Sequence, residues 1–317
     1  MRLAAIDIGT NSTRLLLGDY SRDIFSILER KMRITRLGSG LGENNTISKD
    51  SADKTLDILK TYNKLIESYN VNKCRAVGTS ALRTAKNRSD FISSAEKILG
   101  IRIDVIGGDE EARLSFYGAT KDIIRDYNKS GGIGKVNSKK ILVLDVGGGS
   151  SEFILGEKSS RPDFIKSVDI GCVNISERYM NSDIPDAGQL NKMNNHIRKK
   201  LETTIKKIKN LKAGYLIGVA GTISTLASID LRLDKYDSDR IHKHILEFGK
   251  IKEIYSYLCG LNLEDRKKVR GMDPGRADVI IGGTAIVINV LEMLGSEFIC
   301  ASEKDILDGI IYTLIDF

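Results

Sequence analysis

The sequence predicts an α/β fold of two duplicated lobes, because two of its stretches recur later in the chain. Leu3–Gly18 (LAAIDIGTNSTRLLLG) aligns without a gap on Ile141–Gly156 (ILVLDVGGGSSEFILG), at an offset of 138 residues. Cys74–Arg83 (CRAVGTSALR) resembles Tyr215–Leu226 (YLIGVAGTISTL), since both pass from an apolar strand through Gly-Thr into a helix start. Such a repeat indicates a duplicated domain, and 317 residues suit about two domains. Two lobes, each with a polar hairpin tip, would form a cleft between them.

The composition is that of a soluble globular protein, with 41% hydrophobic and 29% charged residues. A formal net charge of +7 and a pI of about 9.0 favour anionic partners such as nucleotides, polyphosphate or nucleic acid. The chain has no Trp and only 6% aromatic residues, so it offers few platforms on which bases could stack. We therefore expect an anionic ligand and no nucleic-acid partner.

Several features predict a cytoplasmic protein without a membrane partner. Cys74, Cys172, Cys259 and Cys300 are widely spaced and form no CxxC motif, which favours reduced thiols. The N-terminus enters an apolar strand at once, so no signal peptide is expected. The longest apolar run, Ile280–Leu294, is too short and too polar to span a bilayer.

The second copy of the repeated hairpin has the residues expected of a phosphate and metal site. The apolar run Ile141–Leu144 is followed by Asp145, three glycines and two hydroxyls, then Glu152. This pattern predicts a hairpin with a glycine tip, where backbone N–H groups point outward and an anion can approach closely. The carboxylates can hold Mg²⁺ or orient a water. A plain glycine-rich hairpin would explain three glycines alone, but the copy at Leu3–Gly18 favours a functional interpretation.

Apolar periodicity predicts the elements of the first lobe. Strands are expected at residues 3–8, 14–20, 25–33, 74–78 and 101–106, and helices at residues 48–69, from 79 onward, 91–99 and 112–127. The glycine-rich segment Arg36–Thr46 is expected to form a loop beside the cleft.

Apolar periodicity also predicts the elements of the second lobe. Strands are expected at residues 141–144, 153–155, 164–170 and 215–219, and helices at residues 171–180, 190–211, from 220 onward, 277–294 and 301–315. Asn128–Lys140 has no apolar period and is expected to be a mobile surface loop near the crossing between lobes. His242 and His244 are two residues apart, which places them on different faces of a helix and predicts no zinc site.

Two charged groups in the first lobe stand at helix starts. Asp109, Glu110 and Glu111 precede the helix at residue 112, where capping and the helix dipole would be a sufficient explanation for them. Arg83 lies in the first turn after Thr79, and a helix N-terminus with an arginine is suited to phosphate. Taken alone, such an arginine is more often solvent-exposed.

Six motifs, taken together, resemble one family. They are DIGTNSTRLLL (residues 7–17), VGTSALRTA (77–85), GDEEAR (108–113), LDVGGGSSE (144–152), GVAGT (218–222) and MDPGRADVI (272–280). Their types and order are similar to those of the exopolyphosphatase and guanosine pentaphosphatase family, within the actin, sugar kinase and Hsp70 superfamily. The resemblance runs from residue 3 to about residue 312 and so covers nearly the whole chain.

The resemblance implies two actin-like (ribonuclease H-like) lobes with mixed five-stranded sheets and helices. The first lobe would comprise residues 1–124 plus 302–317 and the second residues 125–301, because the last helix of this superfamily returns to the first lobe. Longer family members carry an additional C-terminal helical domain that this chain stops before, and a homodimer is left open.

The resemblance also implies roles for individual residues. Glu111 would be the general base that activates the attacking water, with Glu110 as the fallback if the register is off by one. Asp145 and Glu152 would hold Mg²⁺ or another divalent cation, with Asp7 near it. The phosphates would be bound by Asn11, Ser12, Thr13, Arg83, Gly147, Gly148, Gly149, Ser150, Gly221 and Thr222.

The implied reaction is metal-dependent hydrolysis of the terminal phosphoanhydride of inorganic polyphosphate. The alternative within the class is conversion of pppGpp to ppGpp, and the catalytic residues do not discriminate between these substrates. More distant alternatives are a small-molecule kinase of the same superfamily and a non-catalytic polyphosphate or alarmone binder. The basic helix at residues 190–211 is interpreted as a solvated face, with a track for a long polyphosphate tail as the alternative.

Overall fold

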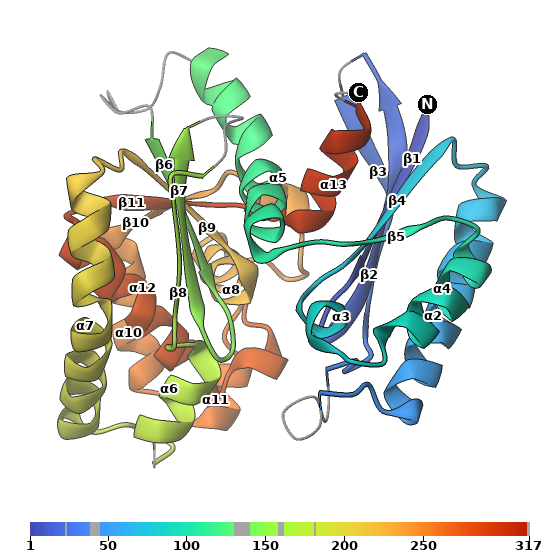
Figure 1. The fold of residues 1–317 in the computed structure, drawn as a ribbon. Helices are drawn as coiled ribbons and strands as arrows, with labels where there is room; N and C mark the ends of the chain where they lie inside the picture. Colours follow the sequence, from blue (N-terminus) through green and yellow to red (C-terminus); the bar gives the residue numbers. More distant parts are fainter. Residues whose placement is uncertain (23, 39–44, 130–139, 158–161, 181, 316–317) are drawn as a thin grey trace. The chain divides into compact units, whose positions relative to one another are not determined.

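The computed structural model describes residues 1–22, 24–38, 45–129, 140–157, 162–180 and 182–315, with only the backbone described for residues 124–129. It divides into two compact units, each built on a mixed sheet (Figure 1). Unit 1 comprises Met1–Gly118 and Asp305–Phe317, and unit 2 comprises Ala119–Lys304. The lobe boundaries expected from the sequence stay predictions. The loops expected at residues 36–46 and 128–140 lie largely outside the described residues.

The sheet of unit 1 has five strands in the order β3-β2-β1-β4-β5. Strands β1 and β2 form the first repeated hairpin, with β3 antiparallel to β2, while β4 runs parallel to β1 and β5 parallel to β4. The strands are β1 (Arg2–Ile8), β2 (Ser12–Ser21), β3 (Ile24–Ile34), β4 (Lys73–Gly78) and β5 (Ile103–Val105). All five were expected from the apolar pattern.

Helices cover both faces of this sheet because alternate strand residues are buried on opposite sides. Leu15 and Leu17 belong to the cluster shared with α2 and α4, whereas Leu16 packs with α13. Ser48 caps α2 by accepting a hydrogen bond from the Ser51 N–H. The helices are α2 (Lys49–Ser68), α3 (Ser80–Thr84), α4 (Arg88–Leu99), α5 (Gly108–Lys129), which continues into unit 2, and α13 (Ile306–Ile315).

The sheet of unit 2 has six strands, in the order β10-β11-β9-β6-β7-β8, and not the expected five. Neither β10 nor β11 was expected at its position, because they have only three and four residues, too few to show a clear period of two. The last helix was expected from residue 301, but β11 includes Ala301 and the helix begins at Ile306. The strands are β6 (Lys140–Val146), β7 (Ser151–Glu157), β8 (Phe164–Val168), β9 (Tyr215–Val219), β10 (Ile245–Glu247) and β11 (Phe298–Ala301).

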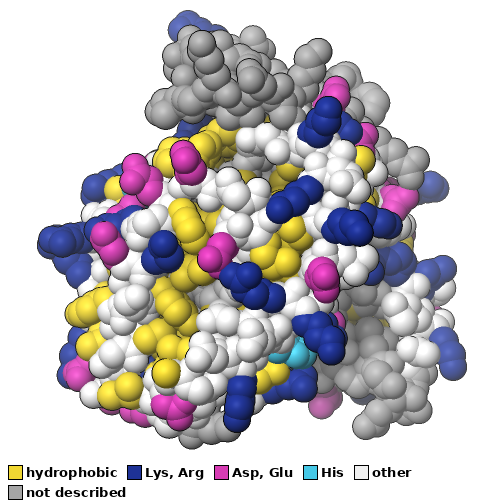
Figure 2. Space-filling view, turned by 90° about the vertical axis from the view of Figure 1, so that its left-hand side faces the viewer, with side chains coloured by type: hydrophobic (Ala, Val, Ile, Leu, Met, Phe, Trp, Pro, Cys, Tyr) yellow, Lys and Arg dark blue, Asp and Glu magenta, His cyan; other side chains and the backbone are white. Residues whose placement is uncertain are grey.

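The helices of unit 2 are α6 (Cys172–Tyr179), α7 (Ala187–Asn210), α8 (Ala220–Asp230), α9 (Ser238–Ile241), α10 (Phe248–Cys259), α11 (Leu263–Lys267) and α12 (Ile280–Leu294), with a 3₁₀ turn η1 (Pro274–Arg276) before α12. Helices α6, α7, α8 and α12 were expected at about their observed positions, whereas α9, α10 and α11 were not expected. Figure 2 looks onto the side of the molecule where Figure 1 places α7. No described helix is long and apolar enough to cross a membrane.

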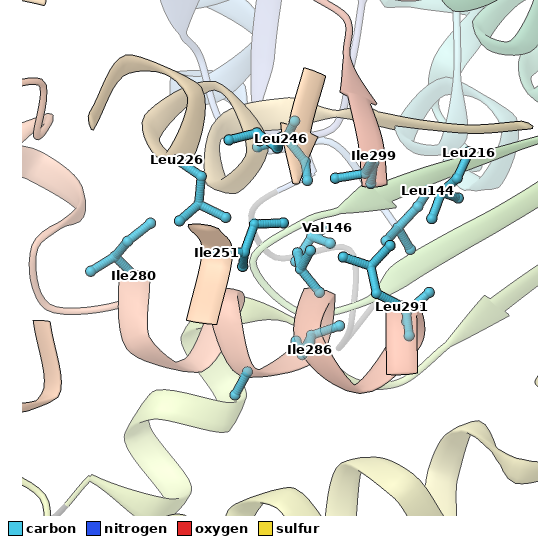
Figure 3. Packing of buried hydrophobic residues seen from close by; sticks show 14 of the residues in the cluster. Leu144, Val146, Leu216, Leu226, Leu246, Ile251, Ile280, Ile286, Leu291 and Ile299 are labelled. Atoms are coloured by element: carbon cyan, nitrogen blue, oxygen red, sulfur yellow. The ribbon is translucent and has the colours of Figure 1, made fainter. Parts of the chain in front are cut away.

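The core of unit 2 lies between its sheet and α12. Leu144 and Val146 of β6 are buried in one cluster with Ile286 and Leu291 of α12, as Figure 3 shows. Gly282 brings α12 against α6, since a Cβ there would lie 2.4 Å from the Ser176 Oγ. This packing holds β6 and α6 in place, and both lead to the second repeated hairpin tip.

Candidate active site

The two repeated hairpins have the same tip. The Gly9 N–H donates to the Ser12 carbonyl at 3.0 Å, and the Gly147 N–H donates to the Ser150 carbonyl at 3.0 Å. A Cβ on either glycine would lie 3.0–3.1 Å from that serine carbonyl oxygen, so glycine fits the turn best. The offset of 138 residues is therefore a repeat of backbone geometry as well as of sequence.

In the second tip, the carbonyl groups are engaged by the start of α6. The Gly147 and Gly148 carbonyls each accept a backbone N–H at 2.9 Å, from Cys172 and Val173, and the Gly149 carbonyl accepts the Asn174 side-chain amide at 2.6 Å. Within the described residues, the N–H groups of Gly148 and Gly149 have no acceptor, and both glycines are exposed. A loop with inward carbonyls and outward N–H groups is a site for an anion.

The first tip is arranged in the same way. The Thr10 carbonyl accepts the Gly38 N–H at 2.9 Å, and the Asn11 carbonyl accepts the N–H groups of Thr35 and Arg36 at 3.0 and 2.9 Å. Thr10 and Asn11 are exposed, and their own N–H groups have no acceptor among the residues described. Each hairpin therefore presents free donors at its tip.

Two of the expected phosphate ligands are turned inward. Thr13 is fully buried, with its hydroxyl 3.1 Å from that of Thr35. Thr222 is 2% exposed and packs against Gly283. The structure therefore places Asn11, Ser12 and the glycine tip at the surface, and it does not place these two threonine hydroxyls there.

Opposite charges occupy equivalent positions in the two hairpins. In unit 1, Arg14 lies across from Asp7 in the β1–β2 ladder, and its Nη2 and Nε are 2.6 and 2.9 Å from the Asp7 Oδ2. A further nitrogen of Arg14 contacts the Asp305 Oδ2 at 2.6 Å. Asp7 is 3% exposed, and burial raises its pKa, while Arg14 opposes that shift. The first hairpin therefore neutralises its own carboxylate.

In unit 2 the residue across from Asp145 is Glu152, so two carboxylates face each other in the β6–β7 ladder. The Glu152 Oε1 accepts hydrogen bonds of 2.7 Å from the hydroxyls of Ser150 and Ser167, which fix its position. Carboxylates directly opposite one another repel, and a divalent cation would relieve that repulsion. In the described part of the chain, no group of three or more His, Cys, Asp or Glu residues could hold a metal.

The structure brings Glu111 and Arg83 together in unit 1. The Arg83 Nη1 lies 2.9 Å from the Glu111 Oε2 and also donates to the Ile106 carbonyl at 2.8 Å, and both charged side chains are one-third exposed. Glu111 is near enough to Asp7 for its charge to contribute to the raised pKa of that residue. Glu111 thus belongs to the surroundings of the first hairpin.

Glu110, the fallback base, is engaged elsewhere. Both of its carboxylate oxygens accept hydrogen bonds from Arg113, at 2.7 and 2.8 Å. These hydrogen bonds lower the pKa of Glu110. Its pairing is that of a residue that stabilises the first turns of α5.

Sequence reasoning assigned no role to Arg276 of η1, whose guanidinium lies against Gly221 at the start of α8. A Cβ on Gly221 would lie 1.8 Å from the Arg276 Cζ, so the glycine makes room for this guanidinium. Asp273 holds Arg276 through an Nε–Oδ2 contact of 3.5 Å. The PGR sequence inside MDPGRADVI could have pointed to this residue, because it places an arginine a few residues before the buried helix α12.

The two histidines lie outside helices, which corrects the expectation that they occupy two helix faces. His242 follows α9, with its Nε2 2.9 Å from the Asp122 Oδ2, and His244 precedes β10, with its Nε2 2.7 Å from the Asp230 Oδ2. Each histidine pairs with a different carboxylate.

Comparison with known proteins identifies the family. Residues 19–316 match the model of the Ppx/GppA phosphatase family, and the chain belongs to this family. Exopolyphosphatase 2 of Mycobacterium tuberculosis is 35% identical over 99% of this chain and 98% of its own length. Guanosine-5'-triphosphate,3'-diphosphate pyrophosphatase of Photobacterium profundum is 28% identical over 98% of this chain but only 59% of its own length. The crystal structure of the type II variant of the Aquifex aeolicus Ppx/GppA phosphatase has a TM-score of 0.86 at 28% identity and covers 99% of both chains.

Proposed function

We propose that this protein hydrolyses the terminal phosphoanhydride of inorganic polyphosphate and releases orthophosphate. The observation that carries the proposal is the reversed charge within the repeated hairpins. Arg14 pairs with Asp7 in one copy, whereas in the other Glu152 stands across the ladder from Asp145, beside a donor-rich tip. The same scaffold would thus offer anion donors twice and a pair of carboxylates for a cation once, as hydrolysis of a polyanion requires.

The residues present suit a divalent cation, with Mg²⁺ as our choice. Asp145 and Glu152 would hold it. Mg²⁺ is commonly bound through one or two carboxylates, with waters and substrate phosphates completing its shell. When bound, the cation would neutralise charge on the phosphate oxygens. Asp7, buried and paired with Arg14, is proposed to orient that arginine and not to bind the cation.

Glu111 is proposed as the general base. It would take a proton from the attacking water as the water oxygen bonds to the terminal phosphorus. The bridging P–O bond breaks, and its electron pair stays on the shortened chain. Arg83 holds the Glu111 carboxylate through one nitrogen and keeps further N–H donors for a phosphate oxygen.

The substrate phosphates are proposed to bind at the hairpin tips. The free N–H groups of Asn11, Gly148 and Gly149 and the hydroxyl of Ser12 would donate to phosphate oxygens. Gly147 shapes the second turn, and Ser150 would act by holding the Glu152 carboxylate. At α8, Gly221 would serve by seating Arg276, whose guanidinium is suited to phosphate.

Polyphosphate is preferred over pppGpp as the substrate because the chain matches a named exopolyphosphatase over almost the full length of both proteins. The match to the relative named for the guanosine substrate covers only 59% of that relative's length. Phosphate release from long polyphosphate, tripolyphosphate and pppGpp, each with Mg²⁺ and with chelator, tests the proposal. Metal-dependent release from polyphosphate is expected. Phosphate release from pppGpp but not from polyphosphate would refute polyphosphate as the substrate. Equal phosphate release with Mg²⁺ and with chelator would refute the requirement for a divalent cation.

A further inference from the structure

The positive charge of this protein is concentrated on one helix. The chain carries a net charge of +7. Helix α7 contains seven basic residues and one acid, Glu202, and so has a net charge of +6. The basic residues are all exposed: Lys192, Arg198, Lys199, Lys200, Lys206, Lys207 and Lys209.

Several lysines on other surface helices are paired with acids. Lys60, Lys250 and Lys267 each pair with an acid three residues away on their own helix, and Lys268, which caps α11, pairs with Asp265. Among the described residues, the lysines of α7 form no such pair, and only Arg198 contacts a carboxylate, that of Glu292. A helix face that only needed solvation could use the same i,i+3 pairing, so seven basic residues with a single acid on α7 point to an anionic ligand.

The positive potential extends beyond α7 to its neighbour α6. Burial lowers the pKa of His196, and the nearby charges of Arg178, Lys200 and Lys199 lower it further. Arg178 is on the last turn of α6, and the ring of the next residue, Tyr179, lies 5.5 Å from that of His196. Cations of two helices therefore share one surface.

This surface is connected to the second hairpin within unit 2. Helix α6 begins at Cys172, whose N–H binds the tip carbonyl of Gly147, and it ends beside α7. The buried side of α7, including Met193, Ile197 and Leu201, packs on the core, so its lysines point outward. Lys and Arg side chains are spread over the face seen in Figure 2, on the α7 side of the molecule.

We propose that the exposed face of α7, together with Arg178, is a secondary binding site for the distal part of a long inorganic polyphosphate chain. This proposal rests on the proposed function, because the terminal phosphate of the bound polyphosphate would lie at the second hairpin. A helix of this length spans roughly 36 Å, which suits an extended polymer better than a compact nucleotide. Six of its seven cations are lysines, point charges on flexible stems that suit a polymer without fixed register.

The test compares two variants with the same charge change. One replaces Lys199, Lys200, Lys206 and Lys207 by Gln, and the control replaces four exposed lysines of α2, Lys49, Lys54, Lys60 and Lys64. We expect the α7 variant to raise KM for long polyphosphate by about tenfold, since four exposed contacts each contribute a few tenths of a kcal/mol. Its kcat and its KM for tripolyphosphate should not change, and the control should match wild type.

Equilibrium binding without metal separates this site from the reaction. Binding of long polyphosphate, tripolyphosphate and an oligo-dT of equal charge is measured over a range of salt concentrations. Weaker binding of long polyphosphate by the α7 variant alone, with a shallower salt dependence, supports the site even if wild type proves inactive. Equal loss in both variants, no loss, or equally tight α7-dependent binding of oligo-dT would overturn it.

Discussion

At the scale of single residues, one position separates the two halves of the duplication. Arg14 and Glu152 occupy equivalent places, and each lies across the ladder from an aspartate. The gapless sequence alignment already sets Glu152 at the position of Arg14, but only the structure shows that Arg14 pairs with Asp7 and Asp305. The burial of Thr13 could not be predicted, because its partner Thr35 lies 22 residues away.

Replacing Glu152 by Gln should raise the Mg²⁺ concentration needed for half-maximal activity by at least about tenfold, since one of two facing carboxylates is lost. Phosphate release titrated with Mg²⁺ measures this. Ser167→Ala, which removes only one hydrogen bond to the Glu152 Oε1, is the milder comparison. An unchanged Mg²⁺ requirement in Glu152→Gln would rule out Glu152 as a cation ligand.

At the scale of elements, the hairpins and long helices follow from apolar period, glycines and caps. Among the strands the failures are the short ones, since β10 has three residues and β11 four, and such segments gain their identity from pairing across the sheet. The twelve-residue helix α10 was also not expected. Contacts that join distant elements also escape the sequence. Helices α5 and α13 meet through two glycines, Gly118 and Gly309, which are 191 positions apart in the chain.

Gly309→Ala should destabilise unit 1, because its Cβ would lie 1.9 Å from the Leu114 carbonyl oxygen. Overpacking of this kind costs about 1–3 kcal/mol. Gly249→Ala on α10 is the matched control, since a Cβ there meets nothing within 4 Å, and it should be neutral or slightly stabilising. Urea unfolding of both variants measures the difference, and equal stability would show that α5 and α13 do not pack this closely.

At the scale of the whole molecule, the duplication and the six motifs predicted the fold and the family, because the repeat extends over most of the chain. They could not predict the side-chain contacts within unit 2 that join residues far apart in sequence. Asp122 of α5 is 6% exposed, and its Oδ2 lies 2.7 Å from the Nζ of Lys304, the last residue of that unit, and 2.9 Å from His242.

Asp122 should make stability depend on acid pH. Burial alone would raise its pKa, but His242 and Lys304 hold the pKa below the ordinary value of 3.8. The folded state therefore favours the charged form, and this stabilisation is complete above about pH 4 and is lost as the pH falls below it. Unfolding free energies of wild type and Asp122→Asn between pH 6 and pH 3 test this. The unfolding free energies of the two proteins should approach each other as the pH falls. A difference that stays constant over this range would contradict the pairing of Asp122 with His242 and Lys304.

The most direct test of the proposed reaction compares two neighbouring acids on α5. Glu111 faces Arg83, whereas Glu110 is held by Arg113. With Mg²⁺ and polyphosphate, Glu111→Gln should lower kcat by about two orders of magnitude or more, because proton transfer from water is lost. Glu110→Gln should retain most of the activity. Full activity of Glu111→Gln, or a greater loss in Glu110→Gln, would contradict the assignment of the base.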